Sequence, residues 1–195
     1  MGVGLYWKNA IGLDAGAATT AEKGMLNLLD ESSAVYRSSA NAFSENVVAS
    51  KGFRVDSSMF AADEAAGVLR NGSYIKNPAA QRLSDLVTDS GRIGSKNMNG
   101  QYMYVVDQEG SIIIGTRSGQ RMPHPTLVGG ENPQVLGAGI VDIRGGKVYS
   151  VDNASGHFKP GAGSLEAARD AFSKLPSNVF HKNFQGYIPY KAGGG

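Results

Sequence analysis

The hydrophobic period of the chain changes near Gly91, and this change constrains the fold more than any other feature of the sequence. Before it, apolar residues recur at helical spacing, as Ala80, Leu83 and Val87 do. After it, apolar residues gather in short β-prone runs such as Tyr102–Val106. We therefore expect the α+β class, with N-terminal helices packed on a C-terminal antiparallel β-sheet.

The length of 195 residues fits one domain, and the hydrophobic content of 41% with 18% charged residues is typical of globular proteins. We expect a single domain, 1–195, with a helical half at 1–95 and a β-rich catalytic half at 96–191. The absence of cysteine excludes disulfides and thiolate metal sites. The apolar runs are far shorter than the ~20 residues that span a bilayer, so no membrane partner is expected.

Helix start and stop signals predict five helices. The first predicted helix begins at Thr19. The other four run from Ser33 to Ser50, from Asp56 or Ser57 to Asn71-Gly72, from Asn77-Pro78 to Ser90-Gly91, and from Ser164 to Lys174 before Pro176.

Two β-hairpins are predicted in the second half of the chain. The first pairs Tyr102–Val106 with Ser111–Thr116, and the second pairs Gly139–Arg144 with Lys147–Asp152 through a Gly145-Gly146 turn. The loop between the hairpins, 117–138, is long for a compact domain, which is typical of a functional segment.

The net charge of +2 is unevenly distributed along the chain. Residues 1–90 carry eight Lys/Arg against ten Asp/Glu, and residues 91–195 carry eleven against seven. The basic half suits an anionic partner such as RNA or a dinucleotide, although ordinary surface variation explains the asymmetry equally well.

Two histidines are candidates for acid–base chemistry, because neutral imidazole exchanges protons near pH 7. His124 lies in the long loop, and His157 directly follows the second hairpin. A histidine pair cleaves phosphodiesters without a metal when one imidazole takes the proton of the attacking hydroxyl and the other protonates the leaving oxygen. Because the loop and the segment 155–160 flank one hairpin, we expect both imidazoles to line one concave surface. The alternative is that each histidine only caps or hydrogen-bonds a loop.

Neighbouring residues complete the candidate site. Lys159, Arg121 or Arg144 would supply a cation, and the hydroxyls of Thr126 and Ser155 would orient or donate. Gly129 and Gly130 resemble a fragment of a phosphate-binding loop, which tight turns explain as well. No two carboxylates stand at metal-ligand spacing with a histidine, so neither a metal nor another cofactor is expected for this chemistry.

Three segments together resemble a signature of C-terminal effector domains of bacterial polymorphic toxins. They are His124-Pro-Thr-Leu-Val-Gly-Gly130, Gly137-Ala-Gly139 and Ser155-Gly-His-Phe-Lys-Pro160. A similar pattern occurs in plant IQ-motif calmodulin-binding proteins. This chain departs from the pattern at Pro125-Thr126, where Ser-Ser is common, and at Ile140, where an acidic residue is frequent.

The resemblance covers residues 101–175 and implies a secreted toxin of bacterial competition, translocated into the cytoplasm of a target cell and paired with a cognate immunity protein. Toxins of this kind include nucleases and ADP-ribosyltransferases. The leading hypothesis is a metal-independent ribonuclease that uses His124 and His157 on RNA or a nucleotide. The alternatives are an ADP-ribosyltransferase that uses NAD, and a non-enzymatic protein-binding module. The absence of Glu-x-Glu counts against only the arginine-directed transferases.

Overall fold

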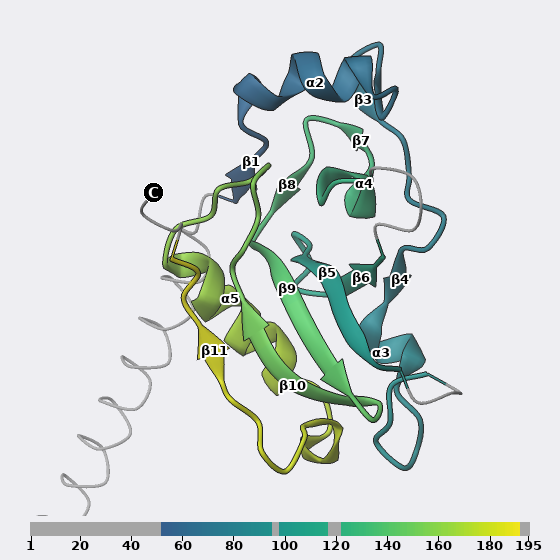
Figure 1. The fold of residues 1–195 in the computed structure, drawn as a ribbon, viewed down its shortest axis with the longest axis vertical. Helices are drawn as coiled ribbons and strands as arrows, with labels where there is room; N and C mark the ends of the chain where they lie inside the picture. Colours follow the sequence, from purple (N-terminus) through teal and green to yellow (C-terminus); the bar gives the residue numbers. More distant parts are fainter. Residues whose placement is uncertain (1–51, 95–97, 117–121, 192–195) are drawn as a thin grey trace, which may run out of the picture. The chain divides into compact units, whose positions relative to one another are not determined.

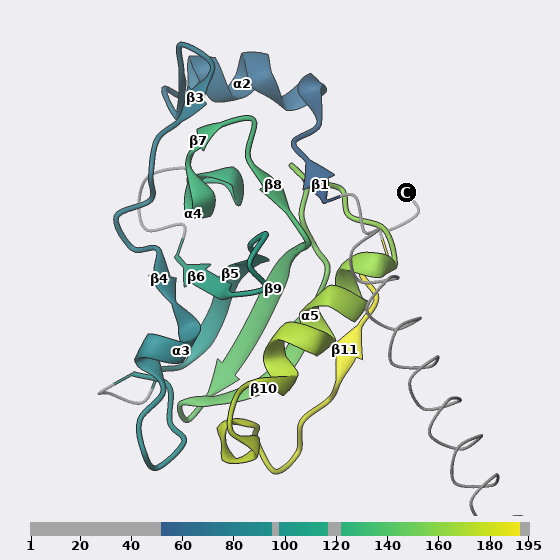
Figure 2. The same ribbon diagram turned by 180° about the vertical axis from the view of Figure 1, so that it is seen from behind.

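The computed structural model describes residues 52–94, 98–116 and 122–191, which belong to one compact unit that spans residues 50–195. The class is mixed α+β, as the sequence predicts. A central sheet carries the longest described helix, α5 (Gly163–Ser173), on one face, and Figure 2 shows this helix lying across the strands. Short strands and helices gather at one end of the sheet, the top of Figure 1.

The central sheet has six strands. In order across the sheet they are β11 (Tyr187–Ile188), β10 (Lys147–Asp152), β9 (Gly137–Arg144), β5 (Gly100–Val106), β6 (Ile112–Gly115) and β4 (Gln81–Arg82). All neighbouring strands are antiparallel except β10 and β11, which are parallel. The predicted antiparallel sheet therefore ends in one parallel edge pair, because the chain crosses over through α5 before β11 begins.

Both faces of the sheet are buried, and side chains of β5 alternate between them as the pleat requires. Tyr104 and Val106 face the α5 side, where Phe172 packs at the centre of the larger hydrophobic cluster. Met103 and Val105 face the opposite side, where they pack in a second cluster with Leu127, Val135, Ala138 and Phe158. The rings of Tyr104 and Phe172 meet edge to face with centroids 5.7 Å apart.

Short elements complete the described fold, and some of them carry residues of the second cluster. They are two 3-10 turns, η1 (Ser57–Met59) and η2 (Ser177–Val179); three short helices, α2 (Phe60–Ala65), α3 (Leu83–Leu86) and α4 (Pro125–Val128); a two-stranded sheet of β1 (Phe53–Arg54) and β8 (Gln134–Val135); and a three-stranded sheet of β2 (Leu69–Arg70), β3 (Ser73–Tyr74) and β7 (Gly130–Glu131). Of these, α2 and β3 are linked to the segment 155–160, because Tyr74 of β3 donates to Asp63 of α2 and Asp63 contacts His157.

Several predicted elements are confirmed. Both hairpins form, as β5–β6 and β9–β10, and the helix predicted from Ser164 to Lys174 is α5. Gly145 and Gly146 have φ values of 57° and 71°, the left-handed conformations that a tight two-residue turn requires.

The predicted helix from Asp56 to Asn71-Gly72 is wrong beyond Ala65. Asp56 does begin it, because its side chain accepts a hydrogen bond from the Ser58 amide at 2.9 Å. However, Asn71 and Gly72 have φ values of 51° and 77° and form the turn of the β2–β3 hairpin. Asn-Gly signals a hairpin turn as strongly as a helix end, and the hairpin is what forms here.

The predicted helix from Asn77-Pro78 to Ser90-Gly91 is also wrong. Asn77 is buried and folds its own loop, because its side chain accepts a hydrogen bond from the Ala79 amide at 2.8 Å and donates to the Thr116 carbonyl at 3.1 Å. The segment then forms β4, which pairs with β6, and only the single turn α3 is helical.

The expected packing of N-terminal helices on the sheet needs correction. Among the described residues, the helix that covers the sheet is α5, from the second half of the chain, whereas strands β1 to β4 precede residue 90. The predicted boundary at 95/96 does not separate a helical half from a β-rich half, because β4 before it and β6 after it pair in one sheet. The loop 117–138 contains α4, β7 and β8, and the helices predicted from Thr19 and Ser33 lie outside the described residues.

Candidate functional site

The segment 155–160 forms a tight turn that presents His157. The Ser155 carbonyl accepts a hydrogen bond from the Lys159 amide at 2.9 Å, and the Ser155 hydroxyl accepts one from the Phe158 amide at 3.3 Å. The Phe158 ring anchors the turn in the second hydrophobic cluster. Ser155 is thus a buried turn residue, and its hydroxyl is engaged with the backbone.

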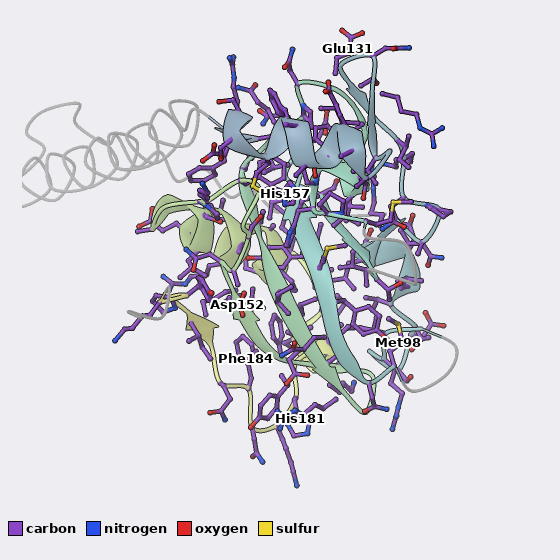
Figure 3. The ribbon with its side chains drawn as sticks, turned by 45° about the horizontal axis from the view of Figure 1, so that its top comes forward. Met98, Glu131, Asp152, His157, His181 and Phe184 are labelled. Carbon is purple, nitrogen blue, oxygen red and sulfur yellow. The ribbon has the colours of Figure 1, made fainter. Side chains whose placement is uncertain are left out.

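His157 is held at two points, one at Asp56 before η1 and one at Asp63 on α2. Its carbonyl accepts a hydrogen bond from the Asp56 amide at 2.8 Å, and its Nε2 lies 3.0 Å from the Asp63 Oδ1. Asp63 comes from α2, and its side chain is 8% exposed, whereas the His157 side chain is 16% exposed. Figure 3 shows His157 beneath α2, and shows His181 and Phe184 at the far end of the sheet.

The second carboxylate oxygen of Asp63 is also engaged. The Tyr74 hydroxyl donates a hydrogen bond to the Asp63 Oδ2 at 2.6 Å. Burial, together with the Asp63 carboxylate, raises the pKa of Tyr74 well above its usual range, so the phenol stays protonated and keeps donating. Tyr74, Asp63 and His157 therefore form one hydrogen-bonded chain that fixes the orientation of the imidazole.

The contact with Asp63 determines which ring nitrogen of His157 carries the hydrogen atom. A carboxylate can only accept hydrogen bonds, so Nε2 of His157 carries the hydrogen when Asp63 is ionised. The lone pair then lies on Nδ1, for which no described residue is a partner. Since no buried side-chain nitrogen or oxygen of the described residues lacks a hydrogen bond, Nδ1 must be exposed to solvent. An imidazole oriented by a buried carboxylate, with its other nitrogen open, is the arrangement of a general base.

An ion pair holds the other side of the turn. The Lys159 ammonium donates to the Asp56 Oδ2 at 2.6 Å, and Lys159 adopts a φ of 41°. The hydrogen bond from Lys159, with those from Ser58, keeps the pKa of Asp56 well below its usual range. The Lys159 side chain is 56% exposed, so a cation remains accessible two residues from His157.

The depressed pKa of Asp56 makes the stability of the fold sensitive to acid. Below the ordinary pKa of 3.8, the unfolded chain takes up a proton before the folded chain does, so this carboxylate stabilises the fold progressively less as the pH falls through that range. We expect the urea midpoint of the wild type to fall more steeply from about pH 4 to about pH 2 than that of Asp56→Asn. Asp89→Asn, which removes an exposed carboxylate elsewhere, should keep the wild-type slope. Equal slopes for Asp56→Asn and wild type would contradict the assignment.

His124 does not line an open surface, which corrects the expected geometry. It is 1% exposed, and its Nε2 lies 2.9 Å from the Gly139 carbonyl of β9. Thr126 is fully buried, and its hydroxyl donates to the Pro123 carbonyl at 2.7 Å. Both residues fold the start of α4 onto the sheet, so a substrate on the surface reaches neither side chain in this conformation.

The other residues predicted for the site are scattered. Gly129 and Gly130, with φ values of 73° and 79°, end α4 and lead into β7. Arg144 stacks on the Tyr149 ring at 3.5 Å and pairs with Asp142 near the Gly145-Gly146 turn, the opposite end of the hairpin from His157. Arg121 lies outside the described residues.

The sequence identified His157, Lys159 and Ser155 but missed Asp63 and Tyr74. Asp63 is an ordinary acidic residue in a short helix, 94 positions before its histidine partner, and no local spacing connects the two. The burial of Asp63 distinguishes it from exposed acidic residues, but the helical pattern of the surrounding sequence does not show that this position is buried.

The described residues contain no group of three or more His, Asp or Glu side chains that is placed to hold a metal ion. None of the helices in the same ranges has the length and apolar character needed to cross a bilayer. Comparisons with the known protein families, with curated proteins and with solved structures give no match.

Proposed function

We propose that this chain is the enzymatic domain of a polymorphic-toxin effector, and that it cleaves RNA by metal-independent acid–base chemistry centred on His157. The observation that carries the proposal is the 3.0 Å contact between His157 Nε2 and the buried Asp63, which leaves Nδ1 open to solvent. A buried carboxylate behind an accessible imidazole is costly to build and is typical of functional sites.

The proposed chemistry assigns a role to each neighbour. Nδ1 of His157 takes the proton of a ribose 2′-hydroxyl, whose oxygen attacks the adjacent phosphorus while the 5′-oxygen leaves and takes up a proton. Asp63 stabilises the imidazolium that forms, and Tyr74 keeps Asp63 in place. Lys159, mostly exposed beside His157, supplies a cation for the charge that develops on the phosphate oxygens.

His124 has a supporting role in the proposed site and not a catalytic one. Its Nε2 contacts the Gly139 carbonyl, so His124 acts as a positioning residue that connects the start of α4 to β9. Water or the Lys159 ammonium then protonates the leaving 5′-oxygen, which is the step expected of the second histidine. The proposed site therefore uses one catalytic imidazole and not two.

The resemblance to polymorphic toxins supports the biological setting. We propose delivery into the cytoplasm of a competing cell and neutralisation by a cognate immunity protein in the producing cell. The basic balance of residues 91–195 suits an RNA substrate.

Expression in bacteria without an immunity protein tests the proposal. Growth arrest with loss of intact cellular RNA, and cleavage of purified RNA in the presence of EDTA, are the expected results. Growth arrest with consumption of NAD and intact RNA would replace the proposal by the ADP-ribosyltransferase alternative. Normal growth at high expression would favour a protein-binding module.

A further inference from the structure

A pocket of about 380 Å³ lies next to the proposed catalytic chain, between α2, the β2–β3 turn and the β7–β8 turn. Its wall includes the apolar side chains of Phe60 and Leu69 and the Tyr74 ring. Figure 3 shows Glu131, at the rim of this pocket, and His157 on opposite sides of α2. The size of the pocket falls within the range of small-molecule sites.

Three charged side chains line the pocket, namely Arg54, Glu64 and Glu131. No described residue forms an ion pair or a side-chain hydrogen bond with any of them. The pocket thus offers two carboxylates and one guanidinium, none of which neutralises another, around an apolar floor. A complementary ligand carries two cationic groups, one carboxylate and a methylene stem to lie against Phe60 and Leu69.

We infer that this pocket binds a free basic amino acid of the arginine or lysine type. Arg54 pairs with the carboxylate of the ligand, and Glu64 and Glu131 receive its two cations. Charge-assisted hydrogen bonds of this kind are roughly twice as strong as neutral ones. An aromatic wall adds attraction for a guanidinium or ammonium group.

Tyr74 joins this pocket to His157. The Tyr74 ring forms part of the pocket wall, while its hydroxyl donates to Asp63, which in turn holds Nε2 of His157. A ligand that contacts the Tyr74 ring therefore changes the environment of the His157 imidazole through two hydrogen bonds, Tyr74–Asp63 and Asp63–His157. Binding itself does not depend on the proposed ribonuclease activity, so a failure of either proposal leaves the other standing.

Calorimetric titration of the full chain with L-arginine tests the inference. Arginine should bind, and Glu64→Gln or Glu131→Gln should weaken binding about 10-fold each, which is the loss of one charge-assisted contact. Glu166→Gln, which removes an exposed carboxylate from α5, should bind arginine as the wild type does. Citrulline, which lacks the guanidinium charge, should bind at least about 10-fold more weakly than arginine.

Agmatine, which is arginine without its carboxylate, tests the role of Arg54. Agmatine should bind more weakly than arginine to the wild type and equally with arginine to Arg54→Ala. In NMR spectra, arginine should move the His157 imidazole signals more than those of His181, and Tyr74→Phe should reduce that movement. Unchanged arginine affinity in the Glu64→Gln, Glu131→Gln double variant, or preferential binding of adenosine monophosphate, would overturn the inference.

Discussion

His157→Ala should reduce RNA cleavage by roughly 100- to 10,000-fold, the usual contribution of a general acid or base. The reason is that His157 combines an exposed ring nitrogen with a buried carboxylate that orients the other nitrogen. Quantitative cleavage of a labelled RNA, and growth after induced expression, measure the effect. Far-ultraviolet circular dichroism should remain that of the wild type, because the turn is held by Ser155 and Phe158 and not by the imidazole.

His181→Ala is the matched control, because His181 lies at the opposite end of the sheet, where its ring meets Tyr149 edge to face. It should keep nearly full activity. Asp63→Asn should also lose activity and should change the pH profile, since an amide cannot stabilise the imidazolium as a carboxylate does. Full toxicity of a folded His157→Ala variant would contradict the proposed role of His157 as a general base.

Gly139→Ala should destabilise the protein by at least the ~1–3 kcal/mol that is typical of overpacking in a well-packed interior. A Cβ atom at this position would lie 1.9 Å from the Asp152 carbonyl oxygen and 2.7 Å from its carbon. Both obstacles are backbone atoms of β10, and the oxygen also accepts a hydrogen bond from the Tyr104 hydroxyl at 2.7 Å. Relief of the clash therefore separates β9 from the end of β10, directly before the segment that presents His157. Urea denaturation measures the loss.

Gly156→Ala is the control for Gly139→Ala, because a Cβ atom on Gly156 would meet no atom within 4 Å and the residue needs no left-handed backbone. Its free energy of unfolding should stay close to that of the wild type, although it lies beside His157. Equal stability of the two variants would show that β9 and β10 can shift apart at no cost, in conflict with the close approach described here.

The centre of the fold was predictable because its signals are local. The β-prone run Tyr102–Val106 and the Gly145-Gly146 turn each involve residues close in sequence, and the structure forms both as predicted. The short elements before residue 90 were not predictable in this way. The segment from Gln81 to Leu86 has helical spacing, yet pairing with β6 gives its first residues a strand, because tertiary contacts override weak helix propensity.

Half of the candidate site was predictable for the same reason. His157 and Lys159 belong to a distinctive short motif, whereas Asp63 and Tyr74 join them only through the tertiary fold. The burial of His124 follows from its contact with Gly139 across the sheet, which depends on how α4 folds back. No spacing between histidines in the sequence distinguishes an exposed imidazole from one that supports a strand.

The partners of His157 and Lys159 precede them by 94 and 103 residues. During synthesis, α2 leaves the ribosome long before the turn that it must meet, and both strands of the β9–β10 hairpin are made in between. Contacts of such long range close large loops, and such contacts are typical of slower folding. A nascent or prematurely terminated polypeptide that ends before Ser155 therefore contains the carboxylate but no imidazole for it to orient. If the proposed activity holds, a chain that has been synthesised only as far as the β9–β10 hairpin still lacks its acid–base site, so the activity appears only after the segment 155–160 has met α2.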